Sequence, residues 1–207
     1  MSGPSKENTS KENNRPYVIG LTGAIGMGKS ETAKLFAGEG VPVFDADAVI
    51  HQLYAGEAAA MIEAAFPGAT RNGAVDRGAL GRQVTGDPAA LARLEGLMHP
   101  LVAGRREEFL AQTKAPIVVL DIPLLLETGT KVDAVVVATA PEAVQRQRVL
   151  ARPGMTEAKF QALSARQFSD AQKRAQADYL VVTDKGLDDA RDQVRMILAD
   201  IRKKLDA

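Results

Sequence analysis

The sequence lacks cysteine and tryptophan altogether, and only two of its 207 residues are histidine. A chain without cysteine forms no disulfide bond and offers no thiolate nucleophile, which fits a reducing compartment. Because thiol and imidazole ligands are so scarce, a structural zinc site is not expected.

An excess of charge of either sign is also missing, since 26 Lys and Arg residues balance 26 Asp and Glu residues. A neutral chain gives no sign of a surface for nucleic acid or for a membrane. No apolar run reaches the ~18 residues of a membrane-spanning helix, and the N-terminal stretch is polar rather than signal-like. We therefore expect a cytoplasmic protein, a monomer or weak homo-oligomer, whose partners are small molecules.

A glycine-rich stretch is the most informative feature of the chain. Residues 23–30 read GAIGMGKS and match G-x-x-x-x-G-K-[ST] at every fixed position. An apolar run at residues 17–21 predicts a buried strand before it, and residues 31–39 predict a helix after it. Glycines in this setting let backbone N–H groups approach phosphate oxygens at the positive end of a helix. The alternative, a glycine turn without a ligand, is disfavoured by the flanking elements.

The loop defines a predicted site for the phosphates of a nucleotide and for Mg²⁺. Lys29 is expected to reach the β- and γ-phosphates, and the Ser30 hydroxyl is expected to bind Mg²⁺. The predicted nucleotide-binding residues are Gly23, Ala24, Ile25, Gly26, Met27, Gly28, Lys29, Ser30 and Glu31.

Acidic residues follow two further apolar runs. Residues 41–44 predict a strand that leads to Asp45-Ala46-Asp47, and residues 116–120 predict one that ends in Asp121. Ligands of open parallel sheets bind beyond the carboxyl ends of the strands, so we expect these acids near the glycine loop. Asp121 is predicted to face Mg²⁺, often through water. Capping of the next helix stays open for Asp45, and capping of the next turn for Asp121.

Residues 55–114 have a different character, because their pattern is helical and contains no convincing strand. The segment is too long for an ordinary crossover, so it predicts a helical insertion that binds substrate. Its breaks are Pro67-Gly68, Asn72-Gly73 and Asp87-Pro88. His99 precedes Pro100 here, and spacing alone favours a capping or packing residue at a bend.

Two arginines suggest a lid. Arg148 and Arg152 are four residues apart in a helix expected to begin at Pro141, so they are predicted to share one face. Pro153-Gly154 interrupts that helix before another opens at Thr156. The forked, permanently charged guanidinium group suits closure over phosphates, with a solvated helix face as the alternative.

Alternation of strands and helices predicts an α/β fold, a doubly wound five-stranded parallel sheet of the P-loop NTPase type. The strands are expected at 17–21, 41–44, 116–120, 132–138 and 179–182, and a closing helix at 187–205. The predicted organisation is a disordered tail at 1–15, a core at 16–54, 115–140 and 177–207, the insertion at 55–114 and a lid at 141–176.

From Tyr17 to its C-terminus the chain resembles the dephospho-coenzyme A kinase family of P-loop kinases. The resemblance rests on LTGAIGMGKS, VFDAD, LMHPLV, VLDIPLLLE, RVLARPGMT and the run through Gln167, Lys173 and Asp178. It implies ATP-dependent phosphorylation of the ribose 3′-hydroxyl of dephospho-coenzyme A, by a P-loop core with a helical substrate domain and a lid.

The resemblance also implies roles for particular residues. Asp47 corresponds to the acid that accepts the proton of the substrate hydroxyl, Lys29 and Ser30 to residues that hold phosphates and Mg²⁺. Arg148 and Arg152 match the lid arginines. With Asp47, the predicted acceptor-binding residues are His99, Pro123 and Leu124.

Some positions depart from the family pattern, namely Ala24, Met27, Glu31 and Thr183. Two other functions stay open: a P-loop kinase for a nucleoside monophosphate or sugar acid, and a nucleotide-gated interaction protein without phosphotransfer. The long insertion and Asp47 argue against the second of these. A GTPase is not favoured, because no Asn-Lys-x-Asp segment is present.

Overall fold

A five-stranded sheet forms the centre of the protein, seen in a computed structural model that describes residues 15–207. The strand order is β2-β5-β1-β6-β7, and every neighbouring pair is parallel. The strands are β1 (Tyr17–Thr22), β2 (Val43–Asp45), β5 (Ile117–Asp121), β6 (Ala134–Thr139) and β7 (Tyr179–Val182). The predicted doubly wound parallel sheet is confirmed.

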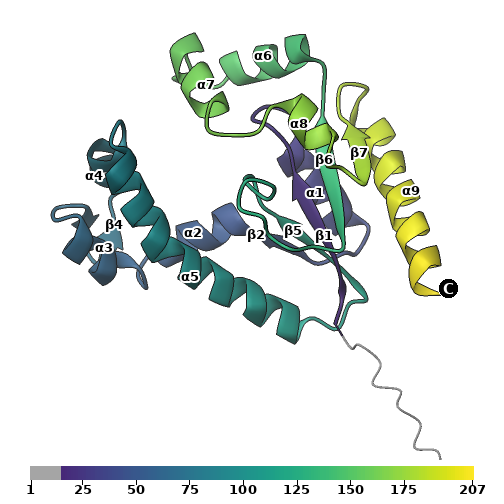
Figure 1. The fold of residues 1–207 in the computed structure, drawn as a ribbon, viewed down its shortest axis with the longest axis horizontal. Coiled ribbons are helices and arrows are strands. Elements are labelled where there is room, and N and C mark those ends of the chain that lie inside the picture. The colour runs from purple at the N-terminus through teal and green to yellow at the C-terminus, as the bar shows by residue number, and fades with distance from the viewer. Residues whose placement is uncertain (1–14) are drawn as a thin grey trace, which may run out of the picture.

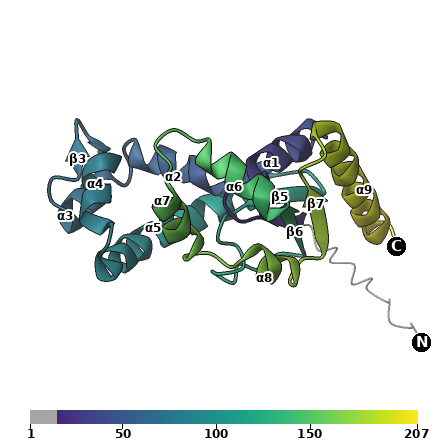
Figure 2. The same cartoon turned by 90° about the horizontal axis from the view of Figure 1, so that it is seen from above.

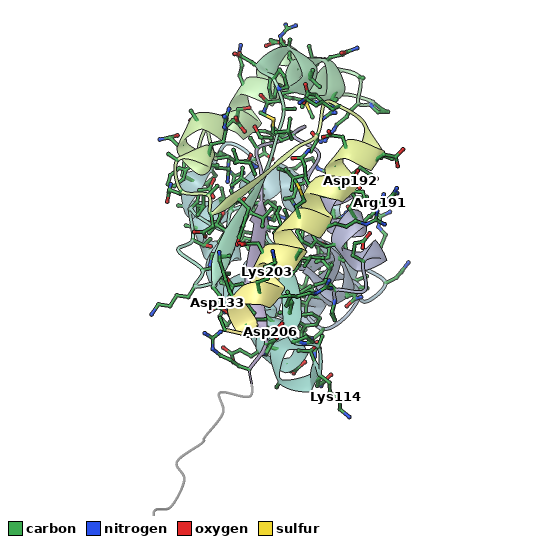
Figure 3. All side chains as sticks on the ribbon, turned by 90° about the vertical axis from the view of Figure 1, so that its right-hand side faces the viewer. Lys114, Asp133, Arg191, Asp192, Lys203 and Asp206 are labelled. Carbon is green, nitrogen blue, oxygen red and sulfur yellow. The ribbon has the colours of Figure 1, made fainter. Side chains whose placement is uncertain are left out.

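Two helices cover one face of the sheet, α1 (Lys29–Gly38) and α9 (Leu187–Leu205). Their apolar side chains share a core with residues such as Ile19 and Leu21 of β1. The opposite face of α9 is charged: Figure 3 shows Arg191, Asp192 and Lys203 on the side of the helix that faces the viewer. This helix is therefore amphipathic, as its sequence pattern indicates.

The long helix α5 (Pro88–Gln112) covers part of the other face. Alternate residues of a strand point to opposite sides, so Val18 packs in this layer while Ile19 packs in the first. Phe109 of α5 contacts Phe44 of β2, with ring centroids 5.7 Å apart. Since α5 begins away from the sheet and ends on it, one helix joins the two parts of the molecule (Figure 1).

A helical cluster lies to one side of the sheet, at the end of the molecule opposite α9 (Figures 1 and 2). It comprises α2 (Ala46–Tyr54), α3 (Ala59–Ala65), α4 (Arg77–Val84) and the first half of α5, which share their own apolar core. Because α2 packs in this core, the cluster includes residues before 55. The division into core, insertion and lid stays a prediction.

Within this cluster the expectation of no strand is wrong. β3 (Thr70–Arg71) and β4 (Ala74–Val75) form an antiparallel pair. Asn72 and Gly73 connect them with φ angles of 53° and 78°. Two-residue hairpin turns need positive φ at both positions, which Asn-Gly supplies, so the dipeptide marks a hairpin rather than a helix break.

The prediction of a bend at His99 is also wrong. α5 runs without interruption through Pro100, and His99 is an exposed residue in its middle. Proline inside a helix removes one N–H donor and usually disturbs the helix. α5 nevertheless stays continuous. Its first half packs in the helical cluster and its second half packs on the sheet.

Three shorter helices follow β6 beyond the carboxyl ends of the strands: α6 (Glu142–Leu150), α7 (Glu157–Ser164) and α8 (Asp170–Arg174) (Figure 1). Because α6 ends at Leu150, Arg152 lies in the turn after it, and the prediction that Arg148 and Arg152 share a helix face is wrong.

The predicted tail at 1–15 falls outside the described residues except for Arg15. The guanidinium group of Arg15 forms an ion pair with the carboxylate of Asp133 at 2.7 Å. Within residues 15–207, no helix has the length and apolar character that crossing a membrane requires.

Candidate active site

The glycine loop between β1 and α1 has a conformation that depends on two of its glycines. Gly26 and Gly28 have φ angles of 81° and 90°. A Cβ atom on Gly26 would lie 2.5 Å from Cγ2 of Val149, and one on Gly28 would lie 2.8 Å from Oγ1 of Thr183. Both the backbone conformation and the lack of space therefore require glycine at these two positions. Glycine allows the loop to pack closely against Val149 of α6 and Thr183 after β7.

The loop and the start of α1 form the wall of a cavity of about 500 Å³. Gly28 caps α1 without a side-chain hydrogen bond, so the first N–H groups of the helix are available to an anion. Of the predicted nucleotide-binding residues, all line this cavity except Met27. Met27 is 2% exposed and its Sδ accepts a hydrogen bond from the Ala140 N–H, so its side chain packs inward.

Lys29 and Asp121 form an ion pair at the base of this cavity. Lys29 Nζ donates to Asp121 Oδ1 at 2.5 Å, and the Asp121 side chain is only 4% exposed. Burial raises the pKa of Asp121, and the nearby charges of Asp45 and Asp47 add to this effect, while Lys29 opposes it. Lys29 lines the cavity, whereas Asp121 is not one of its lining residues.

The two acids near β2 occupy different positions. The strand ends at Asp45, whose Oδ1 accepts a hydrogen bond from the Ala48 N–H at 2.9 Å and caps α2. The capping alternative for Asp45 is therefore confirmed. Asp47 lies in the first turn of α2 rather than at the strand end, and its side chain is exposed.

A second cavity of about 460 Å³ lies between α2, α5 and the loop that follows β5. Its walls are mostly apolar, and all four predicted acceptor-binding residues line it: Asp47, His99, Pro123 and Leu124. The two cavities share four lining residues, Asp47, Pro123, Leu163 and Gln167. We call these four shared residues the partition between the two cavities. Asp47 is the carboxylate of this partition, with the glycine-loop cavity on one side and the apolar cavity on the other.

Arg148 connects α6 to both the glycine loop and the end of β7. Its guanidinium group donates to Thr183 Oγ1 at 2.8 Å and to the Thr183 carbonyl at 2.7 Å. Thr183 Oγ1 in turn donates to the Met27 carbonyl at 2.9 Å. Arg148 and Arg152 line the first cavity, so the structure brings them to one site although they share no helix face.

The sequence analysis assigned no site role to Arg106, to Arg166 or to Gln167, although Gln167 belongs to a run that carries the family resemblance. Arg106 lines the second cavity from α5, together with His99, Val102 and Ala103. These residues have the i, i+3, i+4, i+7 spacing of one helix face, which could have identified Arg106. Gln167 accepts a hydrogen bond from the Ile25 N–H at 3.2 Å across 142 residues of sequence, a contact that no local pattern signals.

Comparison with known proteins connects this site to an activity. A family model described as dephospho-CoA kinase matches residues 17–189. The chain belongs to the dephospho-CoA kinase family. A curated dephospho-CoA kinase from Bradyrhizobium diazoefficiens is 56% identical over 191 residues, which cover 90% of this chain and 96% of the relative. The resemblance stated from the sequence and the prediction of an ATP-dependent kinase are confirmed.

Solved structures agree with this fold. The structure of TT1252 from Thermus thermophilus is similar with a TM-score of 0.80 and 34% identity, over 90% of this chain and 98% of that one. A dephospho-CoA kinase from Campylobacter jejuni has a TM-score of 0.63 at 20% identity, over 90% of this chain and 97% of that one, and shows the same fold.

Proposed function

We propose that the chain transfers the γ-phosphoryl group of ATP to the ribose 3′-hydroxyl of dephospho-coenzyme A, giving coenzyme A and ADP. The observation that carries this proposal is the position of Asp47 on the partition between the two cavities. A phosphoryl donor in the glycine-loop cavity and an alcohol acceptor in the apolar cavity would meet at this carboxylate. Phosphoryl transfer depends mainly on such positioning and on charge stabilisation.

In this proposal the phosphates of ATP bind the N–H groups at the start of α1. Lys29 has three N–H donors and uses one for Asp121, so the others are available to the β- and γ-phosphates. Arg148 uses two of its five N–H donors on Thr183, which orients the group and leaves three for the transferring phosphoryl group. Arg152, exposed in the neighbouring turn, would add a second positive charge.

The residues present fit a bound Mg²⁺. Residues 15–207 contain no group of three His, Cys, Asp or Glu side chains arranged to hold a metal by themselves. Mg²⁺ at nucleotide sites takes one or two protein ligands and completes its shell with phosphates and water. Ser30, exposed at the start of α1, and Asp121 could supply such ligands, directly or through water. When bound, the ion neutralises charge on the phosphates.

The acceptor would lie along the apolar cavity. Phe44, Ile50 and Val102 offer surface for the adenine ring or the pantetheine chain, while Arg106 and Arg166 offer charge for the diphosphate. Asp47 would hydrogen-bond the 3′-hydroxyl, direct its oxygen toward the γ-phosphorus and take the proton as the new P–O bond forms. Proton transfer to a carboxylate positioned in this way is general base catalysis.

A comparison of acceptors tests this function. ADP release is measured with ATP, Mg²⁺ and each of dephospho-coenzyme A, its 3′-deoxy analogue, a nucleoside monophosphate and gluconate. We expect turnover with dephospho-coenzyme A alone, and competitive inhibition by the 3′-deoxy analogue, which keeps every binding group but lacks the acceptor oxygen. Faster turnover of the nucleoside monophosphate or gluconate would refute the proposed acceptor.

A further inference from the structure

Lys173 is a buried cation that no step above uses. Its side chain is 0% exposed, although α8, on which it lies, is a short surface helix. Its Nζ lies 2.8 and 3.0 Å from the two carboxylate oxygens of Glu127, and 3.2 Å from both Thr22 Oγ1 and the Pro123 carbonyl oxygen. Fully buried lysines are rare and are found with a partner, so this cluster has a specific arrangement to maintain.

Two of these contacts lie at the walls of the active site. Thr22 is the last residue of β1 and directly precedes the glycine loop. Pro123 lines both cavities. Thr22 Oγ1 also donates to the Pro123 carbonyl at 2.9 Å, so a single ammonium group and one hydroxyl join the start of the loop to the partition.

Glu127 extends the same connection to the lid segment. Its Oε1 accepts a hydrogen bond from the Phe168 N–H at 2.7 Å. The neighbouring residue, Gln167, lines both cavities and binds the Ile25 N–H of the glycine loop. Burial alone would raise the pKa of Glu127, but the hydrogen bonds from Lys173 and Phe168 outweigh it and hold that pKa below its usual range. Glu127 is therefore the ionised partner of the pair.

The helix that carries Lys173 is itself attached to the sheet. Thr139 Oγ1, at the end of β6, lies 2.8 and 2.9 Å from the carboxylate oxygens of Asp170. Ser169 and Gln172 form a capping box at the start of α8. The contact between Asp170 and Thr139 thus fixes α8 against the end of β6, and Lys173 extends from this helix into the interior.

We propose that the Lys173–Glu127 pair positions the partition between the two cavities, so that donor and acceptor meet in line. Neither residue lines either of these two cavities, so both are positioning residues that act through Pro123 and Gln167. The inference rests on the proposed function. Stability alone does not require this pair, because apolar replacement of a buried ion pair is often neutral or stabilising. A displacement of reacting groups by about 1 Å can cost about 10²-fold in rate.

Three variants and a control test this role. Lys173→Met leaves Glu127 without its counter-charge, so it should lower the unfolding midpoint and also kcat. The double variant Lys173→Met/Glu127→Gln removes both charges while the Gln oxygen can still accept from Phe168. We expect its unfolding midpoint to return toward that of the wild type, while kcat stays lower on the order of 10- to 100-fold. The KM values for ATP and dephospho-coenzyme A should change far less than kcat.

Arg174→Met is the matched control, because it removes an exposed positive charge from the next position of α8. It should have wild-type kinetics. Thr22→Val keeps the ion pair but removes the hydroxyl that contacts Lys173 Nζ and the Pro123 carbonyl. It should lower kcat without changing either KM. This variant is the test of the inference if the charge-free double variant does not fold.

Wild-type kcat in a folded double variant, or in Thr22→Val when the double variant does not fold, would overturn the inference and make the pair structural only. A wild-type protein that is inactive on dephospho-coenzyme A would instead refute the proposed function. An active wild type with equally active variants refutes the positioning role alone.

Discussion

Asp45 and Asp47 are two residues apart, yet the structure predicts opposite consequences for their removal. Asp47 is exposed on the partition between the cavities, whereas Asp45 caps α2. Asp47→Asn should therefore remove activity and leave stability unchanged. Asp45→Ala should lower stability and leave most of the activity.

The expected loss of activity follows from the role of a general base. Asp47→Asn keeps the shape of the side chain and one acceptor oxygen but loses the charge and the basicity. General bases contribute about 10²–10⁴-fold, so kcat should fall by that factor, which equals about 2.7–5.5 kcal/mol of activation free energy. ATP binding should persist, because the glycine loop and Lys29 do not depend on this carboxylate.

The expected changes in stability are smaller and differ between the two variants. Asp45→Ala loses the hydrogen bond from the Ala48 N–H, and removal of such a cap costs about 1 kcal/mol. For a chain of this size that is roughly 2–4 °C in Tm. Asp47→Asn loses a charge near the start of α2, about 0.3–1 kcal/mol, but also relieves repulsion with buried Asp121, so the two effects oppose each other.

The assay is ADP release at saturating ATP and dephospho-coenzyme A, with thermal unfolding and ATP titration of both purified variants. Wild-type kcat in Asp47→Asn together with its loss in Asp45→Ala would show that the acceptor site was assigned to the wrong carboxylate. Failure of Asp47→Asn to bind ATP would contradict the expectation that the glycine loop and Lys29 hold ATP without this carboxylate.

The remaining predictions concern the cations and the buried ion pair. Lys29→Met should nearly abolish turnover and also cost about 1–3 kcal/mol of stability, because it leaves a buried carboxylate without its partner; unchanged kcat in a folded variant would exclude the loop as the donor site. Arg148 and Arg152 should be protected from chemical modification when ATP and acceptor are both bound, and equal reactivity with and without ligands would show that they do not close over the phosphates. The pKa of Glu127 is lowered, so its contribution to stability is present above its ordinary pKa of about 4.3 and is lost as pH falls through the lower folded value. The free energy of unfolding should thus fall more steeply on acidification in the wild type than in Lys173→Met/Glu127→Gln, and parallel pH curves would contradict this linkage.

Much of this protein follows from the sequence by itself, because the relevant chemistry is local. A strand, a glycine loop and a helix are each determined by neighbouring residues, so the sequence was enough to select a set of residues that, apart from the inward side chain of Met27, line one cavity. The five strands were likewise predicted, since buried parallel strands are continuous apolar runs. Asn72-Gly73 contained a hairpin signal that the helical pattern around it outweighed.

Only the tertiary structure decided which residues from distant parts of the sequence line the same cavity or contact one another. Asp47 became a residue of both cavities because α2 packs against α5 and the loop after β5 lies beside it. The burial of Lys173 depends on Glu127 and on Thr22, which is 151 positions away in the chain. Contacts of this kind arise from the packing of elements that form independently, so no local propensity or spacing encodes them.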